Sequence, residues 1–497
     1  MWRRRLAAAA SLTAVTVLVG CSSPTQQQVH ETDSALPEAM EFATSLQEQI
    51  SIDALMGHLR KLQQIADDNG GNRALGTPGY DASVEYVADA LRAKGFDVQT
   101  PEFSVRLFDT EPGSVRLGGS EFQARALEFT TGTPGVTATL VAAPVDDTPG
   151  CTPQDYDGLP VAGAVVLVDR GHCPFTEKAQ IAADRGAVAV VVADNVDERE
   201  MGGTLGRGNT LTIPVVSVSK ADGAQLRERP GEVTVAIKAE TRDVVSRNII
   251  AQTTTGSTQD VVMVGAHLDS VPEGPGINDN GSGSAAVLET ALQLGSSPKV
   301  QNAVRFGFWG AEEIGLMGSH SYVESLDRDQ LLDISMYLNF DMLGSPNPGY
   351  FTLDGDQSIR VDRGQVPPRV PEGSAGIERT LAAYLDSAGM TDESTSFDGR
   401  SDYDAFTLAG IPSGGLFSGA EEEKTEEQAK EWGGEAGAEF DPNYHKPGDN
   451  IDNIDQTALS IHGAGVGYAV GLYAQDQSGR NGMPIRDDRT RHEIAPS

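Results

Sequence analysis

The sequence has few basic residues, few cysteines and no long apolar run after its first twenty residues. It contains 37 lysines and arginines but 72 aspartates and glutamates, so the formal net charge of the 497-residue chain is −35. Such a surface repels nucleic acid and anionic lipid headgroups, so nucleic acid is not expected as a partner. It suits peptides that carry a free amino terminus, although the acidity could equally serve solubility alone.

Two common hydrolase motifs are also missing. The chain contains no HExxH, which argues against a zinc site of the thermolysin type. It contains no GxSxG, which argues against the nucleophilic serine of an α/β-hydrolase. Any hydrolytic chemistry must therefore come from another arrangement of residues.

The first 48 residues indicate export. Residues 1–20 combine three arginines near the start with a short apolar stretch, as in a secretory signal peptide. The segment Leu18-Val19-Gly20-Cys21 resembles the lipobox of bacterial lipoproteins, which predicts a lipid anchor on Cys21. The alternative is an ordinary signal peptide with an incidental cysteine. We expect residues 21–48 to be a polar tether that holds the protein at the extracytoplasmic face of the cell membrane, with partial secretion of the protein as an alternative.

The two remaining cysteines, Cys151 and Cys173, would lie in an oxidising compartment. We predict that they form one disulfide. Two unpaired thiols are the alternative, because sequence alone does not give their distance.

Changes of pattern along the chain predict a split domain. Residues 49–66 and 79–94 have apolar positions at helical spacing, whereas residues 112–240 are rich in Gly, Thr, Val and Pro with short alternating runs. After residue 247, strand-like and helix-like segments alternate, which predicts a doubly wound, largely parallel α/β sheet. Residues 49–111 and 241–475 should thus form one domain around an inserted β-rich module, followed by a disordered tail at residues 476–497.

Potential metal ligands follow three of the predicted strands. Apolar runs end near His267, at the pair Glu312 and Glu313, and at Asp341. The carboxyl ends of parallel strands meet at one edge of a sheet, so these side chains should converge on one crevice. Asp279, in the glycine-bounded loop GINDNGSGS, and His445 complete the set.

This set has the parts of a hydrolytic site with two metal ions. One carboxylate must be shared, and a histidine and another carboxylate complete the ions, with an unligated base beside the attacking water. Asp279 is the natural bridge; His267 and Asp341 would complete one ion, and Glu313 and His445 the other. Glu312 is then left as general base and proton donor to the leaving amine.

Consecutive motifs resemble the zinc aminopeptidases of family M28, especially the small secreted actinobacterial ones. The motifs are AHLDSV, GINDNGSGSAAVLE, GFWGAEEIGLMGS, LNFDMLGSPNPGYF, GRSDYDAF, GLFSGAEEEKT and DPNYHKPGD. The resemblance implies two zinc ions on the same five ligands and Glu312 as base. It adds Tyr444 as hydrogen-bond donor to the oxyanion, Arg400 and Phe417 as walls of the substrate site, and a cis peptide bond between Asp279 and Asn280.

One further resemblance and one departure from the family pattern qualify this interpretation. The segment GAVVLVDRGHCPFTEKAQIAADRGAVAVVVADN resembles the protease-associated (PA) domain, which usually serves as a lid or docking surface and spans residues 112–240 here. Some secreted relatives flank the Tyr-His pair with cysteines, but this chain has Asn443 and Gly448 at those positions. We expect the loop around His445 to be held by other contacts.

Three other interpretations compete with a metalloaminopeptidase. Residues 281–286 satisfy the GxGxxA form of the dinucleotide fingerprint, but they follow the strand ending at His267 at too great a distance for its tight turn. A carboxypeptidase of the same fold is a close alternative, and basic residues placed to hold a substrate carboxylate would distinguish it. A non-enzymatic peptide-binding lipoprotein is a third, but it would be expected to have lost ligands. His58, His320 and His462 lie in helical patterns and are interpreted as structural or surface residues.

Overall fold

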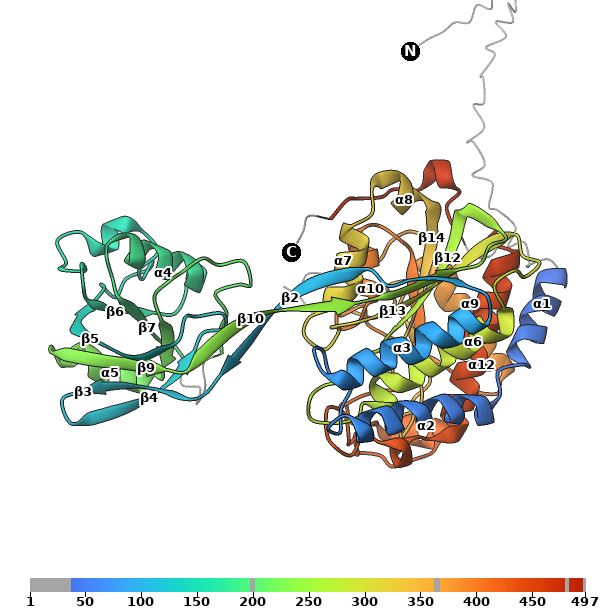
Figure 1. Cartoon of the computed structure of the whole chain (residues 1–497), viewed down its shortest axis with the longest axis horizontal. Helices are drawn as coiled ribbons and strands as arrows, with labels where there is room; N and C mark the ends of the chain where they lie inside the picture. The colour runs from blue at the N-terminus through green and yellow to red at the C-terminus, as the bar shows by residue number, and fades with distance from the viewer. Residues whose placement is uncertain (1–36, 197–201, 362–366, 479–481, 495–497) are drawn as a thin grey trace, which may run out of the picture.

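The computed structural model describes residues 37–196, 202–361, 367–478 and 482–494. The predicted signal peptide, Cys21 and most of the predicted tether lie outside the described residues. The chain forms a larger lobe and a smaller inserted barrel, which are joined by a two-stranded ribbon (Figure 1). Among the described helices, none has the length and apolar character needed to cross a bilayer.

An eight-stranded sheet forms the centre of the larger lobe, in the order β1-β11-β13-β12-β14-β17-β15-β16. The pairs β13 with β12, β12 with β14 and β14 with β17 are parallel, which confirms the predicted doubly wound, largely parallel sheet. Its strands are β1 Asp97–Gln99, β11 Ile249–Gln252, β12 Ser257–His267, β13 Asn302–Trp309, β14 Ile334–Phe340, β15 Phe351–Leu353, β16 Glu393–Thr395 and β17 Ser413–Phe417.

Alternate residues of the central strands enter two different cores, because successive side chains of a strand point to opposite faces. In β12, Val262 and Val264 belong to the larger core, whereas Met263 belongs to the smaller one. The helices over the larger core are α1 Pro37–Gln47, α2 Ile52–Asp68, α3 Pro78–Ala93, α6 Gly283–Leu294, α9 Ser374–Ser387 and α12 Gln456–Gln475. Those over the smaller core are α7 Met317–Glu324, α8 Arg328–Asp333 and α10 Tyr403–Leu408; a further helix, α11 Glu426–Trp432, lies in the acidic segment before His445.

The inserted barrel closes seven strands in the order β3-β4-β8-β7-β6-β5-β9. Its elements are β3 Gly113–Leu117, β4 Ser120–Ala126, β5 Thr133–Ala142, β6 Val165–Asp169, α4 Phe175–Asp184, β7 Ala189–Ala193, β8 Val215–Val218, α5 Lys220–Glu228 and β9 Glu232–Ile237. Cys151 and Cys173 form a disulfide in this lobe, as predicted. The ribbon consists of β2 Glu102–Thr110 and β10 Ala239–Arg247, which pair antiparallel over their whole length (Figure 1).

Two segments are more ordered than their composition suggests. Within the predicted tether, residues 37–47 form α1, whose buried Ala39, Ala43 and Leu46 pack beside α12. Two of these three buried residues are alanines, so the apolar face gives a weak pattern in the sequence. In the tail predicted to be disordered, Arg489 and Arg491 are buried and donate hydrogen bonds to carbonyl groups of the larger lobe. Arginine hydrogen bonds, together with apolar contacts of Met483 and Ile494, hold this tail on the larger lobe.

Candidate metal centre

The five predicted ligands converge at the carboxyl edge of the sheet. His267 is the last residue of β12, and Asp341 directly follows β14. Asp279 lies in the turn Ile277–Ser282 before α6, and Glu313 lies in the turn after β13. His445 comes from a loop more than 100 residues further along the chain, with a positive φ of 56°.

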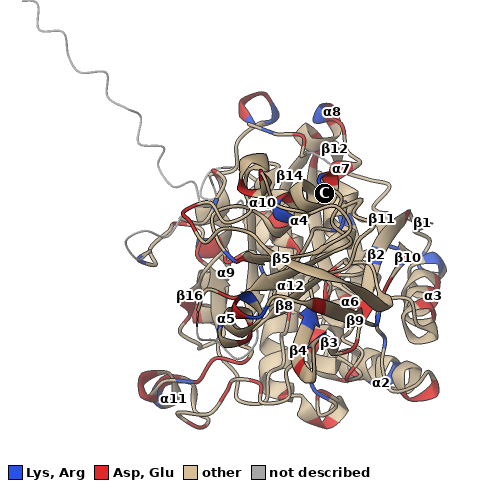
Figure 2. Ribbon diagram, turned by 90° about the vertical axis from the view of Figure 1, so that its left-hand side faces the viewer, with Lys and Arg blue, Asp and Glu red and all other residues tan. Residues whose placement is uncertain are grey.

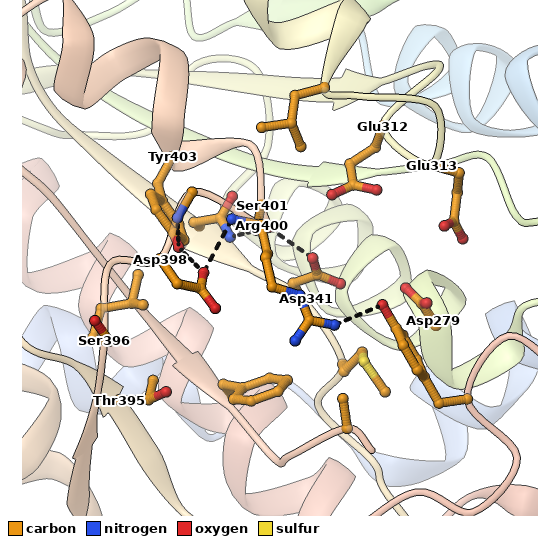
Figure 3. A pocket seen from close by; sticks show the side chains of 18 of the residues that line it. Asp279, Glu312, Glu313, Asp341, Thr395, Ser396, Asp398, Arg400, Ser401 and Tyr403 are labelled. Atoms are coloured by element: carbon orange, nitrogen blue, oxygen red, sulfur yellow. Dashed lines mark hydrogen bonds between the residues drawn. The ribbon is translucent and has the colours of Figure 1, made fainter. Parts of the chain in front are cut away.

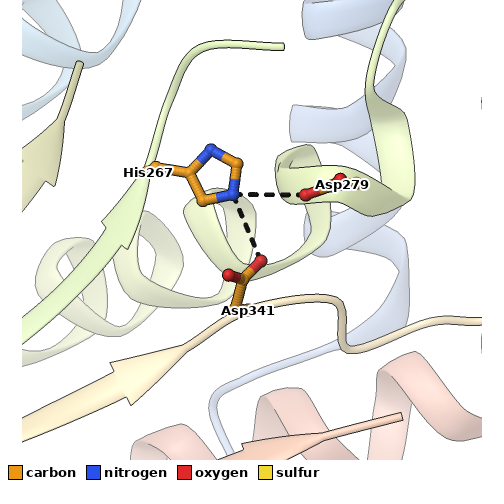
Figure 4. Close-up of side chains that lie close together, drawn as sticks. All are labelled: His267, Asp279 and Asp341. Atoms are coloured by element: carbon orange, nitrogen blue, oxygen red, sulfur yellow. Dashed lines mark hydrogen bonds and ion pairs between the residues drawn. The ribbon is translucent and has the colours of Figure 1, made fainter. Parts of the chain in front are cut away.

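Asp279 offers one oxygen to each half of the centre. Its Oδ1 lies 3.2 Å from His267 Nε2, which is also 3.2 Å from Asp341 Oδ1 (Figure 4). Its Oδ2 lies 3.1 Å from His445 Nε2, which is 3.0 Å from Glu313 Oε2. The two groups of three potential ligands therefore share Asp279, as expected for a bridging carboxylate.

The charges of the centre suit bound cations. Burial and the neighbouring Asp279 raise the pKa of Glu313 to about 8, and burial raises the pKa of Asp402 to about 7. Among the described residues, none hydrogen-bonds the buried Oε1 of Glu313. Histidine nitrogens with carboxylate oxygens form the ligand set typical of zinc, and two dications would relieve the repulsion among these carboxylates. The residues present thus fit two zinc ions.

Glu312 lies in the same cavity as the ligands but does not join either group of three. Its Oε2 is 4.0 Å from His267 Nε2, and Figure 3 shows its carboxylate directed into the cavity beside Glu313. Burial raises the pKa of Glu312 well above its usual value, against the attraction of His267. A buried, unligated carboxylate at this place can accept a proton.

Two buried aspartates that the sequence analysis missed hold the ligand-bearing turns. Asp269 accepts hydrogen bonds from the backbone N–H groups of Glu312 and Glu313, at 3.2 and 3.4 Å. Asp449 accepts those of Asn278 and Asp279, at 2.7 and 2.9 Å. The only signal in the sequence was the position of Asp269, two residues after His267.

A buried arginine, also missed, lies behind the centre. Arg73 is fully buried and donates hydrogen bonds to the carbonyl groups of Leu268, Pro275 and Gly276. These carbonyls flank the strand end at His267 and the turn of Asp279. Burial lowers the pKa of Arg73 to about 10, against the attraction of Asp269, and its positive charge offsets part of the surrounding acidity.

A chain of buried hydrogen bonds ends on the ligand Asp341. Trp309 Nε1 donates to Tyr337 Oη at 2.8 Å, and Tyr337 Oη donates to Asn339 Oδ1 at 3.0 Å. Asn339 Nδ2 donates to Ser401 Oγ at 2.8 Å, which in turn donates to Asp341 Oδ2 at 2.7 Å. Ser401 thereby leaves Asp341 Oδ1 free to face the metal position.

A cavity of about 300 Å³ opens beside the ligands (Figure 3). Its lining includes Arg400, Phe417 and Tyr444. Its apolar wall consists of Leu316, Met342, Leu353, Leu416, Phe417 and Ala420. Arg400 Nη2 donates to Tyr444 Oη at 3.3 Å and pairs with Glu421 at 2.8 Å. The Tyr444 ring stacks on the His445 ring at 3.8 Å, which places its phenol beside the metal centre.

The loop around His445 is held without a disulfide. Asn443 Nδ2 donates to Asn453 Oδ1 at 2.7 Å, and the Asn443 backbone N–H donates to Asp441 Oδ1 at 2.9 Å. A Cβ atom added to Gly448 would lie 3.4 Å from Asn443 Cβ, so the two positions remain neighbours. The predicted cis peptide bond between Asp279 and Asn280 is present.

Most of the chain is similar to known peptidases. Residues 248–470 match the model of peptidase family M28, and residues 136–226 match the PA domain. The chain is 67% identical over 462 residues to a probable lipoprotein aminopeptidase of Mycobacterium tuberculosis, with 92% of each chain covered. It is 39% identical over 465 residues to leucine aminopeptidase 2 of Arthroderma otae, covering 91% of this chain and 90% of the relative.

Two solved structures resemble the whole fold. An aminopeptidase from Aneurinibacillus sp. strain AM-1 aligns with a TM-score of 0.65 and 26% identity, covering 89% of this chain and 98% of that one. A zinc aminopeptidase from Bacillus subtilis aligns with a TM-score of 0.55 and 26% identity, covering 88% and 98%.

Proposed function

The chain belongs to peptidase family M28, and we propose that it is an exported zinc aminopeptidase that hydrolyses the first peptide bond of peptides with a free N-terminus. The convergence of His267, Asp279, Glu313, Asp341 and His445 in two groups that share Asp279 is the observation that carries this proposal. The names of the similar aminopeptidases support the same activity.

The five ligands would hold two zinc ions. His267 and Asp341 would hold one ion, Glu313 and His445 the other, and Asp279 would bridge both through its two oxygens. When bound, the ions would supply Lewis acidity that polarises the scissile carbonyl and lowers the pKa of the attacking water.

Glu312 and Tyr444 would perform the proton transfer and charge stabilisation. The Glu312 carboxylate would take a proton from the attacking water and pass it to the nitrogen of the leaving amine, as the carbon–nitrogen bond breaks. The Tyr444 hydroxyl, positioned by Arg400 at 3.3 Å, would donate a hydrogen bond to the oxygen on which negative charge develops.

The charges of the cavity favour an aminopeptidase over a carboxypeptidase. Among the described residues that line the cavity, Arg400 is the one arginine or lysine, and it is already paired with Glu421. Asp398 and Glu422 also line the cavity, so its charge attracts an ammonium group and repels a carboxylate. The apolar wall around Phe417 would receive the side chain of the cleaved residue, and an apolar side chain suits it.

We also propose that the mature chain begins at Cys21 with a lipid anchor, which is supported by the relative named a lipoprotein. Acylated Cys21 would hold the enzyme at the extracytoplasmic face of the membrane. A Cys21→Ser variant is expected to appear in the soluble fraction of cells whose wild-type enzyme sediments with membranes. Equal sedimentation of both proteins would contradict the anchor.

The activity is tested with amino-acid p-nitroanilides and matched peptides with blocked or free amino termini. The mature enzyme should cleave only the free substrates, should lose this activity with a chelator and should regain it with zinc. Cleavage of blocked substrates alone would refute an aminopeptidase, and activity untouched by the chelator would refute the metal mechanism.

Glu312→Gln tests the assigned base, because the amide keeps the size of the side chain but does not accept the proton. We expect kcat to fall by at least about 100-fold, while zinc content measured by metal analysis stays at the wild-type level. A variant with full zinc and full activity would remove Glu312 from this role.

A further inference from the structure

The turn that carries Glu312 and Glu313 is in contact with the inserted barrel. Arg207 lies in the connection between β7 and β8, and its Nη2 donates a hydrogen bond to the carbonyl oxygen of Ile314. Ile314 directly follows Glu313, so a side chain of the insertion reaches the backbone of the turn that holds the proposed base and a proposed ligand.

This turn has a backbone that needs support from its surroundings. Ala311 and Leu316 have φ values of 60° and 61°, which are unfavourable for residues with a side chain. The N–H groups of Gly315 and Leu316 both donate to the carbonyl of Glu312, at 2.9 and 2.8 Å. Since the turn wraps around the Glu312 carbonyl, a shift of Ile314 would also move Glu312 and Glu313.

Arg207 is itself fixed by Arg106, in the middle of the ribbon strand β2. Its Nη1 donates to the carbonyl of Arg106 at 3.0 Å, and Arg106 Nη1 donates back to the carbonyl of Arg207 at 2.8 Å. The guanidinium also lies 5.4 Å from the centre of the Phe129 ring. Because its acceptors are backbone carbonyls of two elements, the planar guanidinium fixes their relative position in a way that charge alone would not.

Apolar contacts join the same parts of the molecule. Phe103 and Val105 of the ribbon are buried in one cluster with Leu75 and Ala311, and Leu107 and Val244 pack on it together with Ile314 and Met317. The ribbon therefore contacts the turn through apolar side chains, and Arg207 of the inserted barrel contacts it through a hydrogen bond.

We propose that Arg207 is a positioning residue for catalysis: by holding the Ile314 carbonyl, it keeps the Glu312 and Glu313 carboxylates at the metal centre. The inserted barrel is then a structural part of the active site as well as a candidate lid. This role rests on the proposed aminopeptidase function, whereas the bracing of the turn by itself does not.

Arg207→Ala is the direct test, with Arg207→Gln as a second variant that keeps one donor. We expect kcat to fall by about 10-fold or more, because misplacement of a catalytic group slows the chemical step. KM should change less than kcat, since every residue of the apolar wall except Leu316 lies outside this turn. Arg207→Lys should recover only part of the activity, because an ammonium group cannot bond both carbonyls in the same geometry.

Arg185→Ala is the matched control. Arg185 also belongs to the inserted barrel and donates to a backbone carbonyl, that of Pro153 at 2.7 Å, but it contacts Asp157 rather than the larger lobe. It should keep wild-type kcat. An equal loss in Arg185→Ala would mean that kcat follows the stability of the barrel, and the proposal would be overturned.

Hydrogen exchange of the zinc-loaded chain without substrate gives a readout independent of activity. Peptides covering residues 310–320 should exchange faster in Arg207→Ala than in the wild type and in Arg185→Ala. Unchanged exchange together with unchanged kcat would overturn the proposal. If the wild type cleaves no peptide, the proposed function fails, and the exchange result still decides whether Arg207 braces the turn.

Discussion

At the scale of single residues, a hydrogen bond can fix the oxygen of a ligand carboxylate that does not face the other ligands. Asp341 shows this most clearly, because Ser401 bonds its Oδ2 while Oδ1 faces His267. Metal-binding carboxylates held in this way keep their orientation, and loss of such a partner weakens metal binding.

Removing the Ser401 hydroxyl should therefore weaken zinc binding. In Ser401→Ala, Asp341 Oδ2 and Asn339 Nδ2 both lose a partner in a buried place. We expect zinc affinity to fall by about 10-fold to 100-fold, measured by competition with a chromophoric chelator. Ser387→Ala, in which the lost hydrogen bond goes to the Tyr384 carbonyl far from the ligands, is the control and should bind zinc normally.

A second residue, His462, should make the fold sensitive to acid. Its ring is fully buried, Nδ1 lies 3.0 Å from the Leu343 carbonyl, and burial lowers its pKa from 6.5 to about 4, with Asp455 acting in the opposite direction. Because burial favours the neutral ring, the contribution of His462 to the free energy of unfolding is fully present above its unfolded pKa of 6.5. This contribution is lost as pH falls toward 4. The loss between pH 7.5 and 5 should be about 2 kcal/mol.

His462→Asn tests this dependence, since the amide can still donate to Leu343 but does not titrate. The free energy of unfolding in urea is compared at pH 7.5 and 5 for both proteins. The wild type should lose about 2 kcal/mol more than the variant. Equal losses would show that other groups cause the acid sensitivity.

At the scale of elements, the strand ends could be predicted and the loops only in part. His267 and Asp341 were predictable because long apolar runs mark β12 and β14, and parallel strands bring their carboxyl ends together. Asp269 and Asp449 were not, because their role as acceptors for N–H groups of distant turns exists only in three dimensions. The helix α1 was missed because alanines carry its buried face.

The loop around His445 gives a prediction about the two cysteines that this chain lacks. Positions 443 and 448 have Cβ positions 3.4 Å apart, close to the roughly 3.5–4.5 Å of disulfides, so the double variant Asn443→Cys, Gly448→Cys should form one in an oxidising compartment. Closing the loop should slow zinc loss to a chelator, because His445 then loses less of its freedom on binding. Thiol counting by mass spectrometry tests the bond.

The single variant Gly448→Ala should behave in the opposite way. Its Cβ would lie 2.1 Å from Asn443 Oδ1, so the bond from Asn443 to Asn453 must shift. We expect a lower melting temperature and faster zinc loss. A double cysteine variant that keeps both free thiols would contradict the observed proximity of these positions.

At the scale of the whole molecule, acidic groups dominate the surface. Figure 2 shows aspartates and glutamates on α2, α3 and α11 as well as on many loops, with fewer lysines and arginines between them. Removal of the three arginines of residues 1–20 would take the mature chain to −38. At the cavity, Asp398 and Glu422 continue this negative field to the place where a substrate amine would enter.

This field should make the enzyme favour cationic peptides at low ionic strength. For peptides with the same first two residues, lysines at later positions should lower KM relative to serines, because the negative surface raises the local concentration of cationic substrate. The advantage should shrink from 0.02 M to 0.5 M salt, as the Debye length falls from about 20 Å to about 4 Å. Since the lysine and serine peptides have the same residues at the scissile bond, kcat should be equal for both. A preference that persists at high salt would instead indicate direct contacts with the lysines. If there is no preference at low salt, the acidic surface serves solubility and does not attract substrate.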